Sequence, residues 1–404
     1  MPDQQVAPLT GFAADYGTPL LVHDTAVLRQ RAADLQAALP AGSRLLYSVK
    51  ANPLPPVVAA LQAAGCGSEV SSPAELGIAL AGRQTGPICY TGPGKSADEI
   101  AVALQAGAVL CCESLAELDR ARAVRGSDEL PVLLRVQPAS RPPVGLSMAD
   151  GRQFGLTENE ATDLCRRPPA GVQVLGFHCY LGSQLPDCAA LLSGFGYVAE
   201  LIGRLSAVGG VRPRIVNLGG GFPWPYATAG TGPELGPLGG ELDRLLAPLI
   251  EQDTEVWFES GRSLVSAAGR LLTTVLDVKQ RGDRTLVVVD AGIHILGGMS
   301  GLGRVLRPST GFANLTRPDG PIRTVDVVGP LCTPLDRLSS NTPLAEPRVG
   351  DLLCVPNAGG YASTAALTAF LSRPPAIELI TDGEQVEQAW TLRTGHVPVS
   401  LVER

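Results

Sequence analysis

The sequence predicts an α/β chain in which a (β/α)8 barrel is joined to a β-rich domain. Two observations carry this prediction. Short apolar segments alternate with helix-like segments from about residue 44 to residue 258, and such an alternation over roughly 220–250 residues has the length of one barrel. After about residue 264 the helical pattern fades, and strand-like segments separated by turns follow. We therefore expect residues 26–264 to form the barrel, and residues 1–25 and 265–404 to form the β-rich domain.

The barrel strands are predicted from short apolar segments that are bounded by turn residues. A doubly wound open sheet is the structural alternative, but it usually has fewer strands and a glycine-rich loop directly after the first strand. The predicted strands are Arg44–Val49, Ser68–Val70, Ile88–Thr91, Val109–Cys112, Val132–Val136, Val172–Cys179, Arg214–Leu218 and Glu255–Phe258.

Helices are predicted between most of these strands, and serines mark where three of them begin. Ser72, Ser96 and Ser114 are each followed three residues later by a glutamate, which is the pattern of a capping box. The predicted helical segments are Val57–Ala64, Ser72–Ala81, Ser96–Ala106, Ser114–Arg122 and Cys188–Val208.

The β-rich domain is predicted from strand-like segments after the barrel and from one before it. Pro19–His23 precedes a helical segment, Ala26–Ala38, and either pairs with the second domain or leads into the barrel. The segments after the barrel are Arg270–Gln280, Thr285–Asp290, Thr324–Val328, Leu352–Val355 and Ala376–Ile380.

The chain has 404 residues, of which 45% are hydrophobic and 18% charged, so it can bury a large core. The net charge is −7, and because no basic block is present we expect no nucleic-acid partner. No apolar run reaches about 18 residues, so no membrane span is expected. The start lacks the regions of a signal peptide, and the nine cysteines form no CxxC pair. These features favour a cytoplasmic protein with reduced thiols and no metal site.

Lys50 follows the first predicted barrel strand, where a reactive lysine would be well placed. A lysine at the tip of a buried strand is partly desolvated, and desolvation lowers a lysine pKa toward the range in which the free amine is nucleophilic. The alternative is an ordinary rim lysine whose ammonium reaches water. Taken alone, Lys50 does not decide between these interpretations.

The ends of the last two barrel strands favour a cofactor site. Loops seven and eight are the usual phosphate-binding corner of a barrel, and here they carry Gly219–Gly221 and Gly261-Arg262. Since the barrel closes, Glu259 and Lys50 face one cavity. A lysine, a carboxylate and a phosphate grip suit pyridoxal phosphate, with the lysine forming the Schiff base and the acid keeping the ring nitrogen protonated. The alternatives are a flexible glycine turn and a salt-bridged rim acid.

Six motifs in order make the chain similar to a known family: Y-S-V-K-A-N, the G-S-Q loop, G-G-G-F, E-S-G-R, G-P-L-C-T-P-L-D and N-A-G-G-Y. From about Asp15 to Leu401 it resembles the fold-type III pyridoxal-phosphate decarboxylases, which include diaminopimelate, ornithine and arginine decarboxylases. The resemblance implies a barrel plus a β-rich domain, as in alanine racemase. It also implies a head-to-tail homodimer whose active sites each take a cysteine loop from the partner chain.

The resemblance also assigns roles to residues. It implies that Lys50 is the Schiff-base lysine, that Glu259 is the partner of the pyridine nitrogen, and that Cys332 acts on the decarboxylated carbanion from the other subunit. Glu69 stands where the family usually has an aspartate near the lysine. The implied cofactor contacts are Tyr180, Ser183, Gly220, Gly221, Gly261, Arg262 and Tyr361.

Departures from the family pattern bear on the substrate. Tyr180 stands where the family stacks a histidine on the cofactor ring, and the histidine nearby is His178. Thr333 replaces the acid that binds the distal amine of diamino-acid substrates. An amine cation without that carboxylate would cost several kcal/mol in a closed pocket. Arg307 resembles an arginine that binds a substrate carboxylate, and Asp336 is the third expected substrate contact.

These departures resemble a smaller branch, exemplified by the butirosin-pathway decarboxylase of secondary metabolism. It decarboxylates an amino acid, of glutamyl or (methyl)aspartyl type, whose side-chain carboxyl is joined to an acyl carrier protein. We expect Arg304 and Arg307 to dock such a carrier. Decarboxylation of a free amino acid such as diaminopimelate is the alternative. An amino-acid racemase is disfavoured by Glu259, because racemases often face the ring nitrogen with an arginine, and a non-catalytic cofactor-binding protein is typically a single barrel.

Overall fold

The computed structural model describes residues 6–82, 86–139, 153–250, 253–297 and 309–398. The chain divides into two compact units. One unit comprises Leu28–Trp224 and Thr231–Leu264, and the other comprises Met1–Val27, Pro225–Gly230 and Val265–Arg404. The segment Pro225–Gly230 thus interrupts the first unit and belongs to the second.

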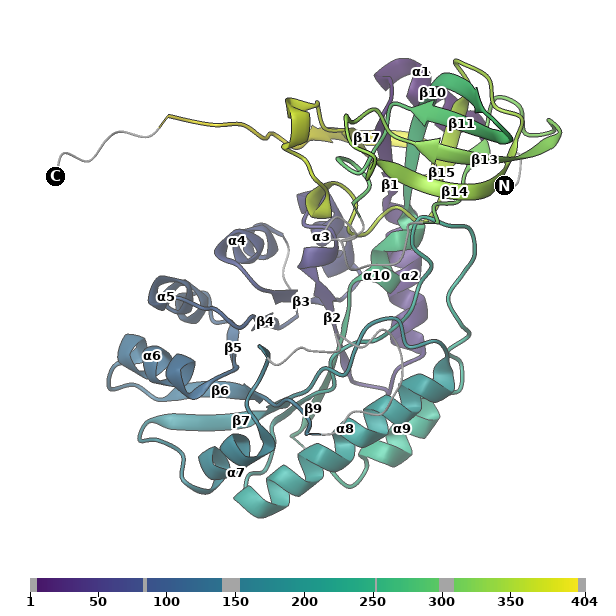
Figure 1. Cartoon of the computed structure of the whole chain (residues 1–404). Helices are drawn as coiled ribbons and strands as arrows, with labels where there is room; N and C mark the ends of the chain where they lie inside the picture. The colour runs from purple at the N-terminus through teal and green to yellow at the C-terminus, as the bar shows by residue number, and fades with distance from the viewer. Residues whose placement is uncertain (1–5, 83–85, 140–152, 251–252, 298–308, 399–404) are drawn as a thin grey trace. The chain divides into compact units, whose positions relative to one another are not determined.

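The first unit contains a closed barrel of eight strands, all parallel (Figure 1). Its first strand, β2, pairs with both β3 and the last strand, β9, so the sheet has no free edge. The predicted (β/α)8 barrel is therefore confirmed, and the open-sheet alternative is wrong. The strands are β2 (Arg44–Ser48), β3 (Gly67–Val70), β4 (Ile88–Tyr90), β5 (Val109–Cys112), β6 (Leu130–Arg135), β7 (Val172–His178), β8 (Ile215–Asn217) and β9 (Glu255–Ser260).

Helices follow the barrel strands, and their capping agrees with the sequence signals. The hydroxyls of Ser72, Ser96 and Ser114 each accept the N–H of the residue three positions later. Of these three serines only Ser96 has the full capping box, because Glu75 instead accepts the N–H of Ser71 and Glu117 pairs with Lys95. The helices are α2 (Thr25–Ala37), α3 (Pro55–Ala63), α4 (Pro73–Ala81), α5 (Ala97–Gln105), α6 (Leu115–Arg125), α7 (Glu158–Arg166), α8 (Cys188–Gly209), α9 (Leu238–Leu246) and α10 (Arg262–Val265).

Helix α8 is long and apolar enough to cross a membrane by length and composition, whereas no membrane span was expected from the sequence. Its most apolar stretch has a mean hydropathy of 1.3, and 56% of that stretch is buried inside the protein. Leu191, Phe195, Val198 and Ile202 lie on one face at helical spacing and are buried. This pattern is that of a helix packed on a protein core.

The second unit is built on a mixed sheet, and one of its interior strands, β1, precedes the barrel in the sequence. Strand β1 pairs antiparallel with β10 and parallel with β16, so of the two alternatives for Pro19–His23 the structure shows pairing with the β-rich part. The order is β14-β13-β11-β10-β1-β16-β17, with β12 and β15 off this path. The elements are α1 (Val6–Tyr16), β1 (Leu20–Asp24), β10 (Gly269–Arg281), β11 (Arg284–Val289), β12 (Ala313–Asn314), β13 (Ile322–Val328), β14 (Arg337–Ala345), β15 (Leu352–Val355), β16 (Ile377–Asp382) and β17 (Gln385–Thr391).

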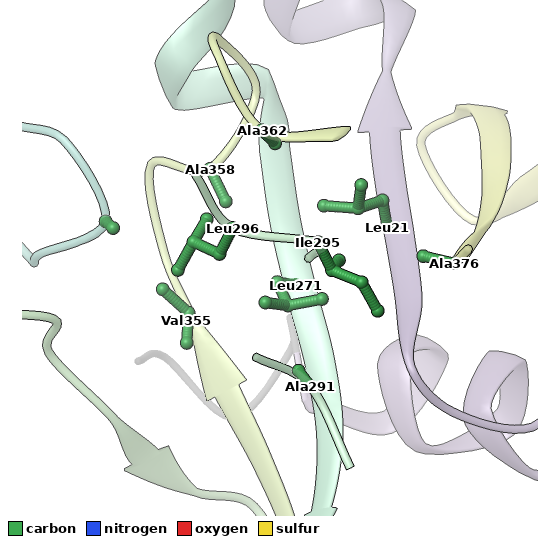
Figure 2. Close-up of a cluster of buried hydrophobic side chains, with 10 residues drawn as sticks. Leu21, Leu271, Ala291, Ile295, Leu296, Val355, Ala358, Ala362 and Ala376 are labelled. Carbon is green, nitrogen blue, oxygen red and sulfur yellow. The ribbon is translucent and has the colours of Figure 1, made fainter. Parts of the chain in front are cut away.

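An apolar cluster holds this sheet together (Figure 2). Leu21 from β1, Leu271 from β10 and Val355 from β15 meet Ile295 and Leu296 from the segment after β11, and all five are at most 4% exposed. Small alanines fill the remaining positions, so the backbones pack closely. Truncating Leu271 to alanine here would cost about 2–5 kcal/mol, because the cavity could not collapse.

Candidate active site

Lys50 lies in a short 3-10 turn, η2 (Val49–Ala51), directly after β2. Its ammonium donates to both carboxylate oxygens of Glu69, at 2.9 Å and 2.7 Å. The side chain of Lys50 is 49% exposed, so about half of its surface reaches water in this chain. The lysine stands two residues beyond the buried strand, where the chain has already reached the rim.

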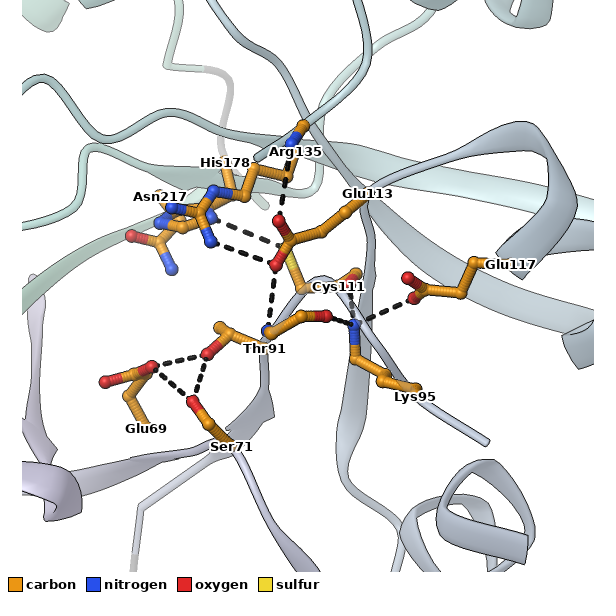
Figure 3. Close-up of polar contacts among 12 residues, drawn as sticks. Glu69, Ser71, Thr91, Lys95, Cys111, Glu113, Glu117, Arg135, His178 and Asn217 are labelled. Atoms are coloured by element: carbon orange, nitrogen blue, oxygen red, sulfur yellow. Dashed lines mark hydrogen bonds and ion pairs between the residues drawn. The ribbon is translucent and has the colours of Figure 1, made fainter. Parts of the chain in front are cut away.

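The carboxylate of Glu69 is buried at the end of β3 and is held by more than the lysine. Its Oε1 accepts the hydroxyl of Ser71 at 3.3 Å and that of Thr91 (Figure 3). Ser71 and Thr91 also share a hydrogen bond of 2.9 Å. The ends of β3 and β4 thus fix the acid that positions Lys50, and neither hydroxyl was predicted from the sequence.

Glu259 lies on β9, next to β2, and is 5% exposed. Its Oε1 accepts the amide N–H of Asn217 at 2.8 Å and lies 3.5 Å from Nε2 of His178. Burial alone would raise the pKa of the Glu259 carboxyl, but the facing His178, the charge of Lys50 and the Asn217 hydrogen bond hold it well below its usual range. Glu259 therefore remains ionised at neutral pH.

The glycine loop after β8 lies against the rim with no room for side chains. A Cβ on Gly220 would lie 2.5 Å from the backbone oxygen of Glu259, and Gly219 and Gly221 adopt φ values of +67° and +121°. Leu185 donates its N–H to the oxygen of Gly221, while the N–H groups of Gly220 and Gly221 have no hydrogen-bond partner among the described residues. Two such N–H groups in one loop can bind an anion.

Tyr180 and His178 have different surroundings, although only one residue separates them. The ring of Tyr180 lies against the backbone of Gly219 and Gly220, and its hydroxyl bonds to Ser183. His178 is the last residue of β7 and is buried inside the barrel. Tyr180 is therefore the aromatic ring at the glycine loop, and His178 lies behind Glu259.

The phosphate residues expected after β9 are also in the barrel unit. Gly261 packs so closely that a Cβ would lie 2.9 Å from Cβ of Ala51, in the turn that carries Lys50. Arg262 follows it at the start of α10 and is partly exposed. The structure thus gathers Lys50, Glu69, Glu259 and the two glycine loops at the carboxyl ends of the barrel strands.

The remaining predicted residues belong to the second unit. Cys332 is exposed in the loop between β13 and β14, and Thr333 is partly exposed beside it. Asp336 is 2% exposed and accepts the N–H groups of Ile293 at 2.8 Å and Leu331 at 2.7 Å. This geometry favours a role for Asp336 in shaping the loop over the expected substrate contact.

Tyr361, Arg304 and Arg307 are the other residues expected at the site. Tyr361 has a φ of +56°, and its backbone oxygen accepts the hydroxyl of Tyr226 at 3.3 Å. Arg304 and Arg307, the expected carrier and substrate contacts, lie outside the described residues.

One polar cluster on the same barrel rim was missed by the sequence analysis. Glu113, after β5, accepts Arg135 at 2.9 Å and the N–H groups of Gly92 at 2.8 Å and Gly155 at 3.3 Å (Figure 3). The guanidinium of Arg135 lies 4.7 Å from the ring centre of Phe154. An acid and an arginine at the ends of adjacent predicted strands were the available signal.

Residues 25–266 match the family described as "Pyridoxal-dependent decarboxylase, pyridoxal binding domain". The chain belongs to the pyridoxal-dependent decarboxylases. Its activity is amino-acid decarboxylation with pyridoxal phosphate, as the resemblance implied. Membership in this family disfavours the racemase and the non-catalytic alternatives.

Most of the similar proteins are named as diaminopimelate decarboxylases. The diaminopimelate decarboxylase of Pseudomonas aeruginosa is 32% identical over 400 residues, covering 94% of this chain and 91% of that protein. The L-glutamyl-[BtrI acyl-carrier protein] decarboxylase of Niallia circulans is 27% identical, covering 93% and 91%. The crystal structure of diaminopimelate decarboxylase from Helicobacter pylori complexed with L-lysine has a TM-score of 0.81 and 26% identity, covering 94% and 95%.

The barrel residues of this decarboxylase fit pyridoxal phosphate. Oε2 of Glu259 makes no hydrogen bond within the described part of the chain, so one oxygen of a buried carboxylate is left for a ring N–H. The unpartnered N–H groups of Gly220 and Gly221 suit a phosphate. Lys50 supplies the primary amine on the same rim. An amine, an anion and a phosphate grip are the three contacts that this cofactor requires.

Proposed function

We propose that this decarboxylase acts on a free amino acid of the diaminopimelate type and removes one α-carboxylate as CO2. The observation that carries the proposal is the buried, ionised Glu259 on the strand next to Lys50. Most of the similar proteins are named as diaminopimelate decarboxylases, which favours the free substrate over the carrier-bound one that the sequence departures suggested.

Each barrel residue has a defined task in this proposal. Lys50 holds the cofactor, and Glu69 orients its ammonium. Glu259 holds a proton on the ring nitrogen, while Ser183, Gly261 and Arg262 join the N–H groups of the glycine loop around the phosphate. When bound, pyridoxal phosphate supplies the electron sink that decarboxylation needs.

We further propose a homodimer in which each active site uses residues of both chains. The partner subunit's Cys332 supplies the proton that replaces the departing carboxylate, and Tyr361 completes the cofactor contacts. Cys332 is exposed in this chain, as a residue that acts on another subunit must be. Mixing the inactive variants Lys50→Ala and Cys332→Ala tests this point, because a mixed dimer would hold one site with both residues intact. Activity that stays absent after mixing would argue for sites within single chains.

A carrier-bound glutamyl or (methyl)aspartyl substrate is the second candidate. Thr333 favours it, because this side chain cannot offer a carboxylate to a distal amine. The similar protein from Niallia circulans is named for such a substrate. In this case Arg304 and Arg307 would dock the acyl carrier protein, or Arg307 would bind a substrate carboxylate.

One competition experiment separates the two substrates. The holoenzyme is given meso-diaminopimelate or glutamate loaded on an acyl carrier protein, and CO2 release is measured together with the intact mass of the carrier. Release from the free amino acid alone supports the main proposal, and mass loss from the carrier alone supports the second. Lys50→Ala is the matched control and should release no CO2 from either. Full activity in that variant would overturn the site assignment.

A further inference from the structure

Two buried groups inside the barrel, Cys111 and His178, have no role in the proposed function. His178 ends β7, and its ring spans two neighbours from other strands. Nδ1 lies 3.4 Å from Sγ of Cys111 on β5, and Nε2 lies 3.5 Å from Oε1 of Glu259 on β9 (Figure 3 shows the contact with Cys111). All three residues are at most 5% exposed.

We propose that His178 is a positioning residue for Glu259, and that Cys111 and His178 form a buried proton-sharing pair that keeps this carboxylate charged and oriented. The inference rests on the proposed contact between Glu259 and the cofactor ring. His178 acts through Glu259 and does not itself touch the reacting atoms.

The charge balance of the barrel supports this role. A buried carboxylate without a facing cation or good hydrogen bonds costs several kcal/mol and tends to take up a proton instead. Asn217 offers Glu259 only a neutral amide N–H. The ammonium of Lys50 already donates to both carboxylate oxygens of Glu69. His178 is therefore the group that can place a positive charge directly beside Glu259.

Cys111 explains how His178 can remain charged in an apolar barrel. Burial alone would lower the pKa of His178, but the facing Glu259 and the Cys111 thiol raise it to about 10. Burial raises the pKa of the Cys111 thiol, yet hydrogen bonds with Cys89 and His178 lower it overall. The imidazolium of His178 thus faces the Cys111 sulfur at Nδ1 and the Glu259 carboxylate at Nε2. A proton lost from Sγ of Cys111 can be held at Nδ1.

Other charged groups around this pair are already matched. Glu113 binds Arg135, and Glu69 binds Lys50. Because these cations are paired with other acids, His178 is the cation that faces Glu259. Among the described residues, the titratable groups that interact electrostatically with Cys111, His178 or Glu259 include Lys50, Cys89, Cys112, Glu113, Glu117 and Arg135, and Glu69 interacts with the neighbouring Cys89.

The first test follows the absorbance of the bound cofactor with pH in the full-length holoenzyme. His178→Gln removes the positive charge and leaves an amide N–H near the position of Nε2. We expect the midpoint of the absorbance change to move by about one pH unit and kcat to fall about tenfold with little change in KM, since one pKa unit is a tenfold change in proton affinity. Cys111→Ala should move the midpoint in the same direction by less.

A matched control is available in the second unit. His23 is also a buried histidine that faces a glutamate, with Nε2 at 3.0 Å from Oε2 of Glu378. His23→Gln should lower the melting temperature and leave the absorbance midpoint where it is. If it moves the midpoint as far as His178→Gln does, general destabilisation explains the effect and the inference fails.

The second test follows the protonation state of the His178 ring directly. The chain has four histidines, so the NMR signal that His178→Gln removes from the ¹³C-histidine spectrum of the holoenzyme identifies His178. We expect this signal to stay in the imidazolium range beyond pH 8 and to titrate at lower pH in Cys111→Ala. A midpoint near 6.5, the ordinary value for histidine, would overturn the inference.

Glu259→Gln separates failure of this inference from failure of the proposed function. If Glu259→Gln leaves the cofactor absorbance profile unchanged, the proposed contact of Glu259 with the ring is wrong. If it changes the profile and His178→Gln does not, only the role of His178 is wrong. A holoenzyme that ignores diaminopimelate but shows the His178 shifts would have another substrate and the same positioning residue.

Discussion

Glu69 is the residue on which the position of Lys50 depends. It is 2% exposed and takes hydrogen bonds from Lys50, Ser71 and Thr91, so its own position is fixed from two strands. Lys50 by contrast is half exposed and has a long flexible stem. Because the Glu69 carboxylate is held rigidly and the Lys50 side chain is flexible, Glu69 determines the position of the Lys50 amine.

Replacing Glu69 with glutamine should therefore weaken binding of the cofactor. A partly exposed ion pair is worth about 1 kcal/mol, which is about a fivefold change in affinity. Absorbance titration of the cofactor-free chain with pyridoxal phosphate measures this change. Ser71→Ala is the control, because it removes a 3.3 Å hydrogen bond to Glu69 and keeps the ion pair. Equal weakening by both variants would contradict the role given to the charge.

Single residues could be predicted only where they stand at a strand end with an unusual side chain. Lys50 and Glu259 met this condition. His178 did not, because it lies within the predicted strand Val172–Cys179, and the sequence of one strand does not say which side chains of other strands it meets. Ser71 and Thr91 are common polar residues whose meeting depends on the pairing of β3 with β4.

At the scale of elements, one buried cation links a loop, a strand and a helix. Lys95, after β4, donates to the oxygens of Gly92 at 2.6 Å and Cys111 at 2.8 Å, and to Glu117 of α6 at 2.8 Å. Lys95 and Glu117 are 3% and 0% exposed. Burial raises the pKa of the Glu117 carboxyl despite the nearby lysine, so the acid depends on its partner.

Lys95→Met should destabilise the protein by roughly 3–5 kcal/mol, because it leaves the Glu117 charge buried and unpaired. Urea unfolding measures the loss. The double variant Lys95→Met with Glu117→Leu should recover much of it, since both charges are then gone. Additive losses in this double-mutant cycle would show that the two side chains do not act as a pair.

The elements found from the sequence are those with a strong local pattern. Every predicted barrel strand is present, with ends that differ by at most two residues from the prediction. The elements that were missed include α1, α7, α9, β12, β14 and β17, and two of them show why a local pattern can be weak. Pro8 and Gly11 interrupt α1, and β17 carries mostly polar, exposed residues because it is an edge strand. Tertiary packing, rather than local preference, decides such segments.

At the scale of the whole molecule, the second unit carries its own acid-sensitive centre. Asp351 is 1% exposed and accepts Arg317 at 2.7 Å, Asn314 at 3.0 Å and the N–H of Arg348 at 2.8 Å. Burial alone would raise the pKa of the Asp351 carboxyl, but these hydrogen bonds lower it. Its contribution to stability is therefore full above the unfolded pKa of about 3.9 and is lost as the pH falls through the lower folded value.

Asp351→Asn should lower the free energy of unfolding at pH 7 by about 2 kcal/mol, because charge-assisted hydrogen bonds to a buried acid are lost. The variant should also lose less stability than the parent chain as the pH falls below 4. Thermal unfolding between pH 3 and pH 7 tests both points. Glu346→Gln is the matched control, since its pair with Arg323 is exposed and should be worth at most about 1 kcal/mol. If Glu346→Gln loses as much unfolding free energy as Asp351→Asn, Asp351 is not the acid-sensitive centre of this unit.

The two-part organisation could be predicted from the change in periodicity, but the membership of Pro225–Gly230 could not. This segment joins the second unit through contacts distant in sequence, with Asn357 donating to the oxygens of Thr228 at 2.7 Å and Gly230 at 3.1 Å. The local pattern of these six residues does not predict such hydrogen bonds. The substrate was equally beyond a local pattern, because substrate choice depends on loops that are distant in sequence.

The interior position of β1, paired on both sides, has a consequence for how the protein is made. Leu20, Leu21 and Val22 are almost fully buried between β10 and β16. A ribosome completes β1 roughly 240 residues before β10, which at ~5–20 residues per second leaves the strand without its partners for ~12–50 s. The barrel is synthesised during that interval, while an apolar strand waits for the end of the chain. We therefore expect nascent chains truncated after the barrel to engage chaperones through residues 20–24.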